Sequence, residues 1–533
     1  MRPHETRPHQ PDADVVVVGN GPIGAVLSVL LAQRGWRVTV LERRPRPYRL
    51  PRATSFDGET ARLLAATGIG ADLGRITEPA NGYQWQTAAG EALLDIAFTT
   101  SGRYGWPDAN TVHQPALEEL VAARVAALPE VTVLRGHEVV DIADGDQGAR
   151  VTVTTDDDTT RVLTTRWVVG CDGANSFVRH HLDVPVTDLG FSYEWLLCDV
   201  QPHEPHESTP TNVQICDPAR PTTAVASGPG RRRWEFMRLP GEPTADLLKE
   251  ETAWHLLSPF GVTPRNATLL RSTTYIFQAR WADQWRVGHV LLAGDAAHLM
   301  PPFAGQGMCS GIRDVVNLSW KLDLVLRGLA PEALLDTYTE ERRAQAQEAI
   351  LASVQLGRVI CVTDPEAAAE RDATVLANRR GKAPTRPEPA RPLTGGLLHG
   401  GVAAGAVVPQ GRVGVGGEVG LFDDVVGRGF VLLVVDESDA GLGKERLAYL
   451  AELGVRVVRV VAGGRVAGVG EVSDVDGVYG GFLAGFGVTG VLVRPDYHVF
   501  GAARGVGGLC ELVDGLRERL RGVGSVGGVR RAS

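Results

Sequence analysis

The sequence predicts an α/β protein with several domains, and three observations support this prediction. The N-terminal part alternates short runs of β-branched residues with helical spacing, the pattern of a parallel β-α-β unit. The middle of the chain changes to shorter alternating segments, separated by turns such as Gly228-Pro229-Gly230. The last part is rich in glycine and valine and again alternates strand and helix patterns. A chain of 533 residues has room for roughly two to four such domains.

The first strand is expected over Asp14 to Val18, because four of these five residues are valines. It leads through a glycine-rich turn, Gly19 to Gly24, into a helix over Ala25 to Arg34. A second buried strand, Arg37 to Leu41, follows and places Glu42 at its end. A strand–turn–helix–strand unit of about 30 residues is typical of a Rossmann-type dinucleotide-binding domain.

The glycine turn has the spacing G-x-G-x-x-G, and each glycine has a physical purpose. Gly19 allows the tight turn, Gly21 lets a pyrophosphate approach the backbone, and Gly24 permits close packing of helix on strand. The N-terminus of the helix then offers free N–H groups and a positive dipole end to the phosphates. Glu42, about 20 residues further on, can accept hydrogen bonds from both ribose hydroxyls of an adenosine without a 2′-phosphate.

Two further segments place carboxylates at strand ends. Val290 to His298 ends a strand in Gly294-Asp295, where Asp295 could hold ribityl or ribose hydroxyls of a flavin. The loop Pro301 to Met308 follows, and its backbone N–H groups could face a flavin pyrimidine and stabilise negative charge on the reduced ring. Cys171 to Ser176 forms a second strand end with a carboxylate and a tight turn.

These patterns divide the chain into domains. The dinucleotide-binding domain is expected in two pieces, residues 12–189 and 282–378, interrupted by a sheet-rich substrate-binding domain over residues 190–281. A long helix is expected from about Gly311 to Arg327, and another from Pro331. An Arg- and Pro-rich linker then leads to a small α/β domain over residues 393–533.

Composition limits the class of protein. The net charge is −9 and the basic residues are scattered, so that nucleic acid is not an expected partner. The six cysteines are far apart, which argues against disulfides and a metal site and favours a reducing compartment. No apolar run approaches a membrane span, and Met1 to Asp14 contains no apolar signal core. A cytoplasmic protein without a membrane partner is therefore expected.

Together, the motifs G-N-G-P-I-G, C-D-G-A-N-S-F-V-R and G-D-A-A-H-L-M-P-P resemble the class A flavoprotein aromatic hydroxylases, the para-hydroxybenzoate hydroxylase superfamily. The similarity is greatest to the 3-(3-hydroxyphenyl)propionate hydroxylase branch, which shares Pro51-Arg52-Ala53, His113-Gln114-Pro115 and Arg232 to Met237. The resemblance implies a Rossmann-type FAD-binding domain, an inserted substrate domain and a C-terminal thioredoxin-like domain. Since thioredoxin chemistry needs two thiols and the last domain contains only Cys510, a dithiol function is excluded there.

The resemblance also implies an activity and a set of roles. FAD, reduced by NADH or NADPH, would react with O2 to a C4a-hydroperoxide that hydroxylates a phenol, ortho to an existing hydroxyl. Arg52 would contact the FAD phosphates or the moving flavin, and Gln114 would lie beside the FAD chain. Arg231, Arg232, Arg233 and Arg280 are candidates for the NAD(P)H phosphates. The residues expected to bind FAD are Gly19, Gly21, Pro22, Ile23, Gly24, Glu42, Arg43, Arg52, Gln114, Asp172, Asp295, Pro302, Gly305, Gly307 and Met308.

A base near the substrate hydroxyl would help, because a phenol attacks better when its proton is removed or shared. The candidates are His113, Tyr193, Tyr104 and His298, and none of them stands out. The substrate is either a small phenolic acid or a larger natural-product phenol. A flavin-dependent dehydrogenase or reductase is the alternative activity, whereas the W-x-W-x-I-P signature of the halogenases is absent from the sequence. A homodimer is possible.

Overall fold

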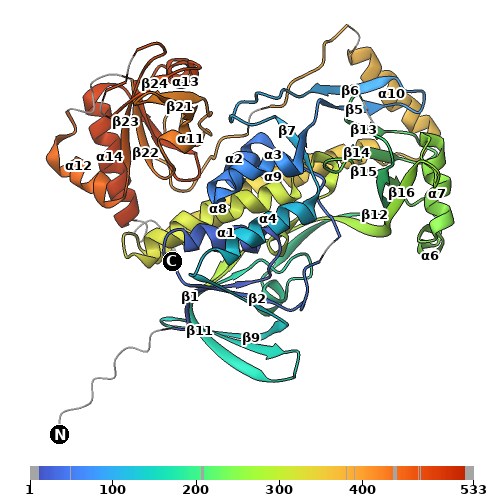
Figure 1. Cartoon of the computed structure of the whole chain (residues 1–533), viewed down its shortest axis with the longest axis horizontal. Helices are drawn as coiled ribbons and strands as arrows, with labels where there is room; N and C mark the ends of the chain where they lie inside the picture. Colours follow the sequence, from blue (N-terminus) through green and yellow to red (C-terminus); the bar gives the residue numbers. More distant parts are fainter. Residues whose placement is uncertain are drawn as a thin grey trace, which may run out of the picture.

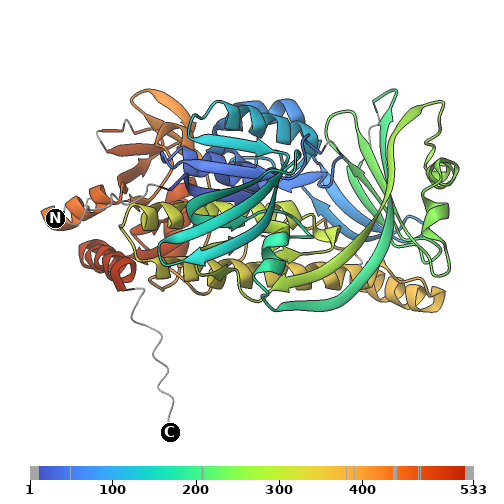
Figure 2. The ribbon, with the colours of Figure 1, turned by 90° about the horizontal axis from the view of Figure 1, so that it is seen from below.

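The computed structural model describes residues 11–522, apart from positions 49, 206–208, 380, 389, 436–440, 466 and 469. Figure 1 shows a central body of helices and sheets, with a large sheet on one side and a separate C-terminal domain on the other. Figure 2, seen from below, shows the same arrangement along the long axis of the molecule. The last eleven residues of the expected third domain, 523–533, lie outside the described part.

The first sheet is the dinucleotide-binding sheet, with the strand order β17-β18-β11-β1-β2-β8. Strand β1 (Ala13–Val18) lies between β11 (Thr160–Gly170) and β2 (Val38–Glu42), and all three are parallel. Val17 of β1 is level with Val169 and Val40, so that the valines predicted as a buried strand form its centre. The remaining strands of this order are β8 (Val131–Arg135), β17 (Arg286–Val287) and β18 (Val290–Leu292).

Three helices pack together on this sheet. Helix α1 (Pro22–Ala32) contacts α4 (Gln114–Ala126) and α8 (Gly307–Leu326). The long helix α8 begins at Gly307, four residues before the predicted start, because the end of the Pro301–Met308 loop already turns into its first turn. In the described part of the chain, no helix is both long enough and apolar enough to span a bilayer.

The second sheet has the order β19-β16-β12-β15-β14-β13-β5-β6 and is called here the substrate sheet, because it contains the segment predicted to bind substrate. Its longest strands, β12 (Val186–Pro202) and β16 (Ala267–Ala282), pair antiparallel along most of their length. The strands β5 (Gly82–Gln86) and β6 (Ala92–Ala97) also belong to it. The sheet therefore extends beyond the predicted range 190–281, because β13 pairs in parallel with β5, a partner far away in the sequence.

The two faces of the substrate sheet bury different side chains, because residues alternate along a strand. On β12, Leu196 and Cys198 pack toward α7 (Glu250–Leu257), in a cluster that also contains Trp234 and Phe236 of β15 (Arg232–Met237). The intervening residues, including Trp195, belong to the cluster on the opposite face, with Phe303 of the flavin-facing loop predicted from the sequence. This second face, called here the inner face, looks toward the dinucleotide-binding domain.

Helices α9 (Asp336–Ile360) and α10 (Pro365–Arg379) follow α8, and α9 also covers part of the inner face. Pro331 precedes a short 3-10 turn, so that the helix predicted from Pro331 begins in regular form at Asp336. After α10 the chain crosses the molecule to the C-terminal domain (Figure 1). The shorter elements are β3 (Ser55–Asp57), α2 (Gly58–Leu64), α3 (Gly70–Ile76), β4 (Thr77–Pro79), β7 (Ala109–Val112), β9 (His137–Gly145), β10 (Gly148–Thr155), α5 (Phe177–His181), β13 (Asn212–Ile215), β14 (Thr222–Ala226), α6 (Thr244–Leu247) and β19 (His298–Leu299).

The C-terminal domain has the thioredoxin-like arrangement. Its central strands lie in the order β23-β22-β25-β26, with β22 parallel to β23 and antiparallel to β25. Cys510, the cysteine of this domain, lies on the last helix. The elements are β20 (Arg412–Val415), β21 (Glu418–Leu421), α11 (Phe422–Val425), β22 (Val431–Val434), α12 (Gly443–Glu452), β23 (Arg456–Ala462), β24 (Glu471–Asp474), α13 (Val478–Phe486), β25 (Gly490–Val493), β26 (Val499–Ala503) and α14 (Gly505–Gly522).

A buried charge cluster joins this domain to α8 and α9. Arg494, which directly follows β25, donates to Glu341 Oε2 of α9 and to Asp496 Oδ2, both at 2.6 Å. Lys321 of α8 donates to the same Glu341 oxygen at 2.8 Å. The side chains of Arg494, Glu341 and Lys321 are fully buried. Two cations thus balance two anions inside the interface, where each needs its partners to remain charged.

A second buried pair lies nearby. Arg62 of α2 donates to both carboxylate oxygens of Asp423 at 2.7 and 2.8 Å, and its guanidinium lies 3.7 Å from the centre of the Tyr497 ring. Both charged side chains are almost completely buried. The C-terminal domain is therefore fixed to the dinucleotide-binding domain at two points by charges that water does not reach.

Replacing Arg494 by Met should lower the free energy of unfolding by about 3–5 kcal/mol, since it leaves the anions of the cluster undercompensated. Urea unfolding followed by circular dichroism measures this change. The control is Arg412→Met, which removes an exposed pair with Asp476 and should cost at most about 1 kcal/mol. Equal losses in the two variants would contradict the importance of the buried cluster.

Candidate functional site

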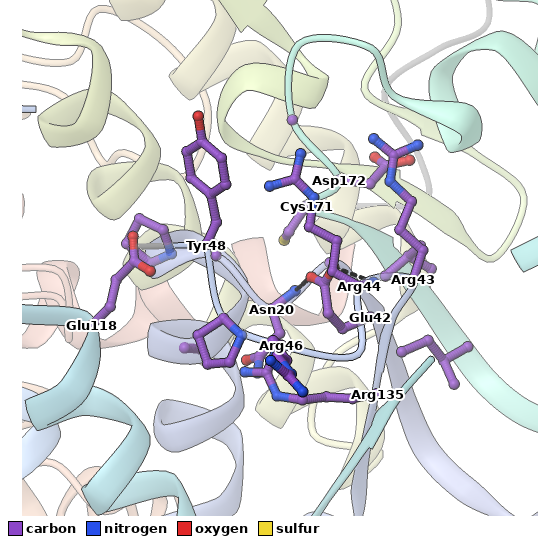
Figure 3. Close-up of a pocket in the computed structure, with 18 of the residues that line it drawn as sticks. Asn20, Glu42, Arg43, Arg44, Arg46, Tyr48, Glu118, Arg135, Cys171 and Asp172 are labelled. Carbon is purple, nitrogen blue, oxygen red and sulfur yellow. Dashed lines mark hydrogen bonds between the residues drawn. The ribbon is translucent and has the colours of Figure 1, made fainter. Parts of the chain in front are cut away.

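A cleft of about 470 Å³ opens at the carboxyl ends of β1, β2 and β11. This is the edge at which parallel α/β sheets bind ligands. Eight residues predicted to bind the cofactor line the cleft: Gly19, Gly21, Pro22, Glu42, Arg43, Arg52, Gln114 and Asp172. Figure 3 shows that side chains from separate parts of the sequence point into this space.

The glycine turn has the geometry that its sequence predicts. Gly19 has a φ of +100°, and a Cβ atom there would lie 2.5 Å from the carbonyl oxygen of Cys171. A Cβ on Gly24 would lie 2.1 Å from the carbonyl oxygen of Gly19. At Gly21, by contrast, a Cβ would meet no atom within 4 Å, because it would point into the cleft. The backbone at Gly21 is thus open to a ligand, while the other two glycines allow close packing.

Helix α1 begins at this open position. Gly21 is its N-cap residue, no side chain of the described residues caps it, and no acidic residue lies in its first turn. The positive end of the helix dipole and its first N–H groups are therefore available to an anion such as a pyrophosphate.

Glu42 lies at the end of β2 and faces the glycine turn (Figure 3). Its Oε2 accepts the backbone N–H of Asn20 and its Oε1 accepts that of Arg44, both at 2.9 Å. These bonds fix the carboxylate at the cleft wall. Each carboxylate oxygen can accept a further hydrogen bond, so that two vicinal ribose hydroxyls fit the same group.

Arginines surround this carboxylate. Arg43, Arg44 and Arg46 follow Glu42 along the chain, and Arg135 comes from β8, the neighbouring strand (Figure 3). In a chain with a net charge of −9, this is a local concentration of positive charge suited to phosphates. Of these residues, the sequence analysis had selected only Arg43.

Arg52 lies on a loop that is held from two sides. Gln114, the first residue of α4, accepts the backbone N–H groups of Arg52 and Ala53 at 2.8 and 2.6 Å through its Oε1. From the inner face of the substrate sheet, Arg233 donates to the carbonyl oxygens of Arg52 and Pro51 at 2.6 and 2.9 Å. The backbone of the loop is thus fixed, while the Arg52 side chain is exposed at the cleft.

Asp172 uses its side chain to hold the turn that follows β11. It accepts the hydroxyl of Ser176 at 2.5 Å and the backbone N–H of Val178 at 3.1 Å, where helix α5 begins. The adjoining Gly173 and Ala174 also line the cleft. The direct contribution of Asp172 is therefore to shape this wall.

Asp295 lies outside the lining of this cleft, in the 3-10 turn Gly294–Ala296 after β18. Burial raises the pKa of Asp295, and the charges of Arg52, His298 and Arg179 oppose that effect. Arg52 therefore acts electrostatically on Asp295, although Asp295 lies outside the cleft lining. Ile23 also connects the two parts, since its side chain packs against Gly294 and Gly311.

The flavin-facing loop predicted from the sequence, Pro301 to Met308, leads into α8. Pro302 and Gly305 are exposed, and Gly305 has a φ of +64°. Gly307 and Met308 form the first turn of α8, so that their N–H groups lie at its positive end. These four residues come together as one surface at the end of a helix, which suits a ligand that acquires negative charge.

Phe303 of the same loop belongs to an aromatic cluster with three residues of the substrate sheet. Its ring centre is 5.8 Å from that of Trp195, 5.8 Å from Phe277 and 6.2 Å from Phe191. Gly357 of α9 makes room for this packing, because a Cβ there would lie 2.6 Å from Phe191 and 2.7 Å from Phe303. The aromatic cluster (Phe191, Trp195, Phe277 and Phe303) forms an apolar wall beside the loop.

The four candidate bases lie in different surroundings. Tyr193 adjoins the aromatic cluster, with its ring 4.9 Å from Phe191, and burial raises its pKa. His298 is buried and bonds through Nε2 to Asp314 at 2.7 Å. Tyr104 is half-buried near the C-terminal domain, and burial raises its pKa to about 12. His113 is the N-cap residue of α4, and burial lowers its pKa.

The structure argues against two of the four arginines predicted for the NAD(P)H phosphates, while Arg231 and Arg280 remain predictions. Arg233 is buried and donates to Asp199 at 2.7 Å as well as to the Arg52 loop, and Arg232 is buried over the Trp234 ring. Both lie inside a strand whose two faces are covered. The arginine run reads as an exposed basic patch in the sequence, but in the sheet these two side chains serve structural contacts.

The cleft fits FAD. The open backbone at Gly21 accommodates a pyrophosphate, Glu42 a ribose, and the loop at the start of α8 an electron-accepting ring. Asn20, Arg44, Arg46, Tyr48, Glu118 and Arg135 also line the cleft but were not predicted. For Arg44 and Arg46 the basic run after Glu42 was the available signal, and for Asn20 its place within the glycine turn.

Comparison with known proteins gives a consistent result. A family model described as an FAD binding domain matches residues 12–353, and one described as the HcaD C-terminal domain matches residues 405–517. A probable NADH-specific resorcinol 4-hydroxylase of Rhodococcus jostii (strain RHA1) is 39% identical over 515 residues, 94% of each chain. A 3-(3-hydroxy-phenyl)propionate/3-hydroxycinnamic acid hydroxylase of Comamonas testosteroni is 32% identical, over 93% of this chain and 95% of that protein.

Solved structures share the fold. Aklavinone-11 hydroxylase in complex with FAD and aklavinone superposes with a TM-score of 0.78 at 24% identity, over 96% of this chain and 99% of that chain. The flavin-dependent monooxygenase PieE, in complex with FAD and substrate, gives a TM-score of 0.79 at 21% identity over the same shares. At these identities the similarity concerns the fold.

Gly21→Ala should abolish or strongly weaken FAD retention, because the added methyl group would enter the cleft without disturbing the packing. We expect affinity to fall on the order of tenfold or more, about 1.4 kcal/mol. The ratio of flavin to protein absorbance after purification measures it. Gly74→Ala, on the exposed side of α3 where a Cβ also meets no atom within 4 Å, is the matched control. Full flavin content in the Gly21 variant would refute the placement of the pyrophosphate.

Glu42→Ala should weaken FAD binding by about 1.5–3 kcal/mol, the value of hydrogen bonds to a charged group. Titration of the apoprotein with FAD, followed by flavin fluorescence, gives the dissociation constant. Glu42→Gln retains one acceptor oxygen, which can serve either the N–H of Asn20 or that of Arg44, and should lose less. Unchanged affinity in both variants would reduce Glu42 to a residue that holds the turn.

Proposed function

Because the chain belongs to the family of FAD-dependent aromatic hydroxylases, we propose that it uses NADH and O2 to hydroxylate a small phenol of the resorcinol type. The observation that carries the proposal is the 39% identity, over 94% of each chain, to a protein named as a resorcinol 4-hydroxylase. In this chain, an aromatic wall lies beside the loop predicted to face the flavin, as such a reaction requires.

A small phenol is favoured over a larger natural-product phenol. The relatives above 30% identity that are reported above carry the names of hydroxylases of single-ring phenols. The solved structures reported above, aklavinone-11 hydroxylase among them, are 21–24% identical and support the fold alone. The close ring packing of Trp195, Phe277 and Phe303 on the inner face also suits a flat ligand of modest size.

The position of the new hydroxyl follows from the chemistry of resorcinol. Its carbon 4 is ortho to one ring hydroxyl and para to the other, and both hydroxyls direct an electrophilic oxygen to it. We therefore propose that oxygen is added at a ring carbon that is ortho to one hydroxyl and para to the other. Hydroxylation ortho to an existing hydroxyl, as the family resemblance implied, is compatible with this position and remains a prediction.

FAD, when bound, would supply the redox chemistry by accepting a hydride and activating O2. The residues of the chain bind and orient the cofactor and the substrate. The N-terminus of α1, Glu42 and the neighbouring arginines would hold the adenosine and phosphates. The start of α8 would stabilise negative charge on the reduced ring, and the aromatic cluster would exclude water from the reacting carbon.

The test is NADH consumption in air by purified, flavin-containing protein, with resorcinol, 3-(3-hydroxyphenyl)propionate and a larger polycyclic phenol compared. We expect resorcinol to accelerate NADH oxidation and to yield a product heavier by one oxygen, with NADPH the poorer donor. Product mass is read by liquid chromatography and mass spectrometry. If NADH is oxidised and no phenol gains oxygen, the activity is that of a flavin reductase and the proposal falls.

A further inference from the structure

A buried carboxylate on the substrate sheet has no role in what has been described so far. Glu235 lies on β15, level with Leu197 of β12, while Arg233 is level with Asp199 and Met237 with Trp195. Residues two apart share a face of a strand. Glu235 therefore points to the inner face, together with Arg233 and Met237, and away from the cluster that contains Trp234 and Phe236.

Both neighbours of Glu235 on this face lead to a cofactor segment. On one side, Arg233 holds the carbonyl oxygens of Pro51 and Arg52, on the loop that lines the cleft. On the other side, Trp195 packs against Phe303 of the flavin-facing loop. Glu235 thus lies between the Arg52 loop and the loop at the start of α8, on the face that looks toward the space between them.

Among the described residues, the carboxylate of Glu235 has a long ion pair with Arg233 as its contact to the protein. Its side chain is 10% exposed, and within the described residues it accepts no hydrogen bond. The nearest cationic nitrogen, Nη1 of Arg233, is 3.8 Å away and donates to the carbonyl oxygen of Arg52 instead. A buried carboxylate without a hydrogen-bond partner is costly, and proteins keep such groups where a ligand completes the contact.

The charged surroundings of Glu235 come from four strands. Asp199 on β12, Arg233 on β15 and Arg271 on β16 act on it electrostatically, and Glu235 in turn contributes to the raised pKa of Tyr83 on β5. Burial raises the pKa of Glu235, Arg233 and Arg271 oppose this rise, and Asp199 adds to it. A carboxyl with a raised pKa is a stronger base than an ordinary glutamate.

We propose that Glu235 is a catalytic residue that accepts a hydrogen bond, and then the proton, from a ring hydroxyl of the phenolic substrate. This inference rests on the proposed hydroxylation of a small phenol. In the step, the O–H bond of the substrate breaks, its electron pair stays on the phenol oxygen, and the proton forms a new O–H bond on a carboxylate oxygen of Glu235. No electrons leave the substrate, and the resulting phenolate has increased electron density at its ortho and para carbons.

Other nearby groups are less suited to this step. Both oxygens of Asp199 accept hydrogen bonds from Arg233, at 2.7 and 3.2 Å. His298 shares its Nε2 with Asp314, whose other oxygen binds Arg342. The Nδ1 atom of His298 has no hydrogen-bond partner among the described residues, but its side chain is almost completely buried. Of the two carboxylates on the inner face, Glu235 is the one whose oxygens accept no hydrogen bond within this part of the chain.

The test is Glu235→Gln in the FAD-loaded full-length protein. We expect the rate of resorcinol hydroxylation to fall about 100-fold, within the range for proton-transfer groups. FAD content and the far-ultraviolet circular dichroism spectrum should stay unchanged, and NADH oxidation should increasingly release hydrogen peroxide in place of product. Glu194→Gln is the matched control. Glu194 lies on the opposite face of the same sheet, pairs with Arg238 and should keep the wild-type hydroxylation rate.

A series of substrates separates chemistry from structure. Fluorinated resorcinols, such as the 2-fluoro and 5-fluoro compounds, have more acidic hydroxyls and depend less on a base. The deficit of the Glu235→Gln variant should therefore shrink as the substrate becomes more acidic. The acid limb of the wild-type pH–rate profile, where protonated Glu235 can no longer accept a proton, should be missing from the variant.

A deficit of equal size for all substrates would overturn the inference, as would a variant as active as the wild type. If Glu235→Gln fails to fold, Glu235→Asp, which keeps the acid but withdraws it by one methylene group, must show the same dependence on substrate acidity. The wild type tests the proposed function separately. If it yields product with resorcinol while Glu235→Gln is unimpaired, only the role of Glu235 falls; if it yields none with any phenol, both fall.

Discussion

The interaction on which the site depends is the buried pair of Arg233 and Asp199. Asp199 compensates the charge of Arg233 inside the substrate sheet, and this allows the guanidinium to donate to the backbone of the Arg52 loop. Arg271 reinforces the contact by donating to the same Pro51 carbonyl at 2.7 Å. The substrate sheet and the dinucleotide-binding domain, which have separate cores, are thereby connected through the Arg52 loop. This contact sets the distance between the cofactor cleft and the inner face, because a buried guanidinium that loses its hydrogen-bond acceptors costs about 3–5 kcal/mol of free energy.

Helix α8 has a comparable position on the other side. Its first turn belongs to the flavin-facing loop, and its middle carries Lys321, which contacts the buried cluster of the C-terminal domain. Asn317, one turn earlier, donates to both Glu341 and Asp496. The thioredoxin-like domain, which lacks the two thiols of redox chemistry, therefore acts on the site by holding the helix that leads to it.

The sequence was most informative where backbone geometry restricts the choice of residue. Gly19 and Gly24 could be assigned their roles because no other residue fits those positions. It was less informative for pairings between distant strands, and β5 and β6 were missed for this reason. The arginines before Trp234 were predicted to bind phosphates because the sequence does not show that both faces of their sheet are covered. On a strand at the surface, the same side chains would be exposed. Glu235 was quoted within a motif, but only the register with Leu197 shows which way it points.

The cluster of Arg494 and Glu341 has a consequence for biosynthesis. The two residues are 153 positions apart, so that a growing chain carries Glu341 and Lys321 long before Arg494 and Asp496 have been made. Until then, the charge of Glu341 is compensated by Lys321 but not by Arg494, and α8 and α9 lack the partner surface that excludes water from them. The ribosome thus completes the dinucleotide-binding fold before it supplies the residues that fix the two helices. Maturation of the cofactor site is thereby coupled to the end of translation, and a chain truncated before residue 494 would reach quality control with a correct Rossmann core but an unfinished site.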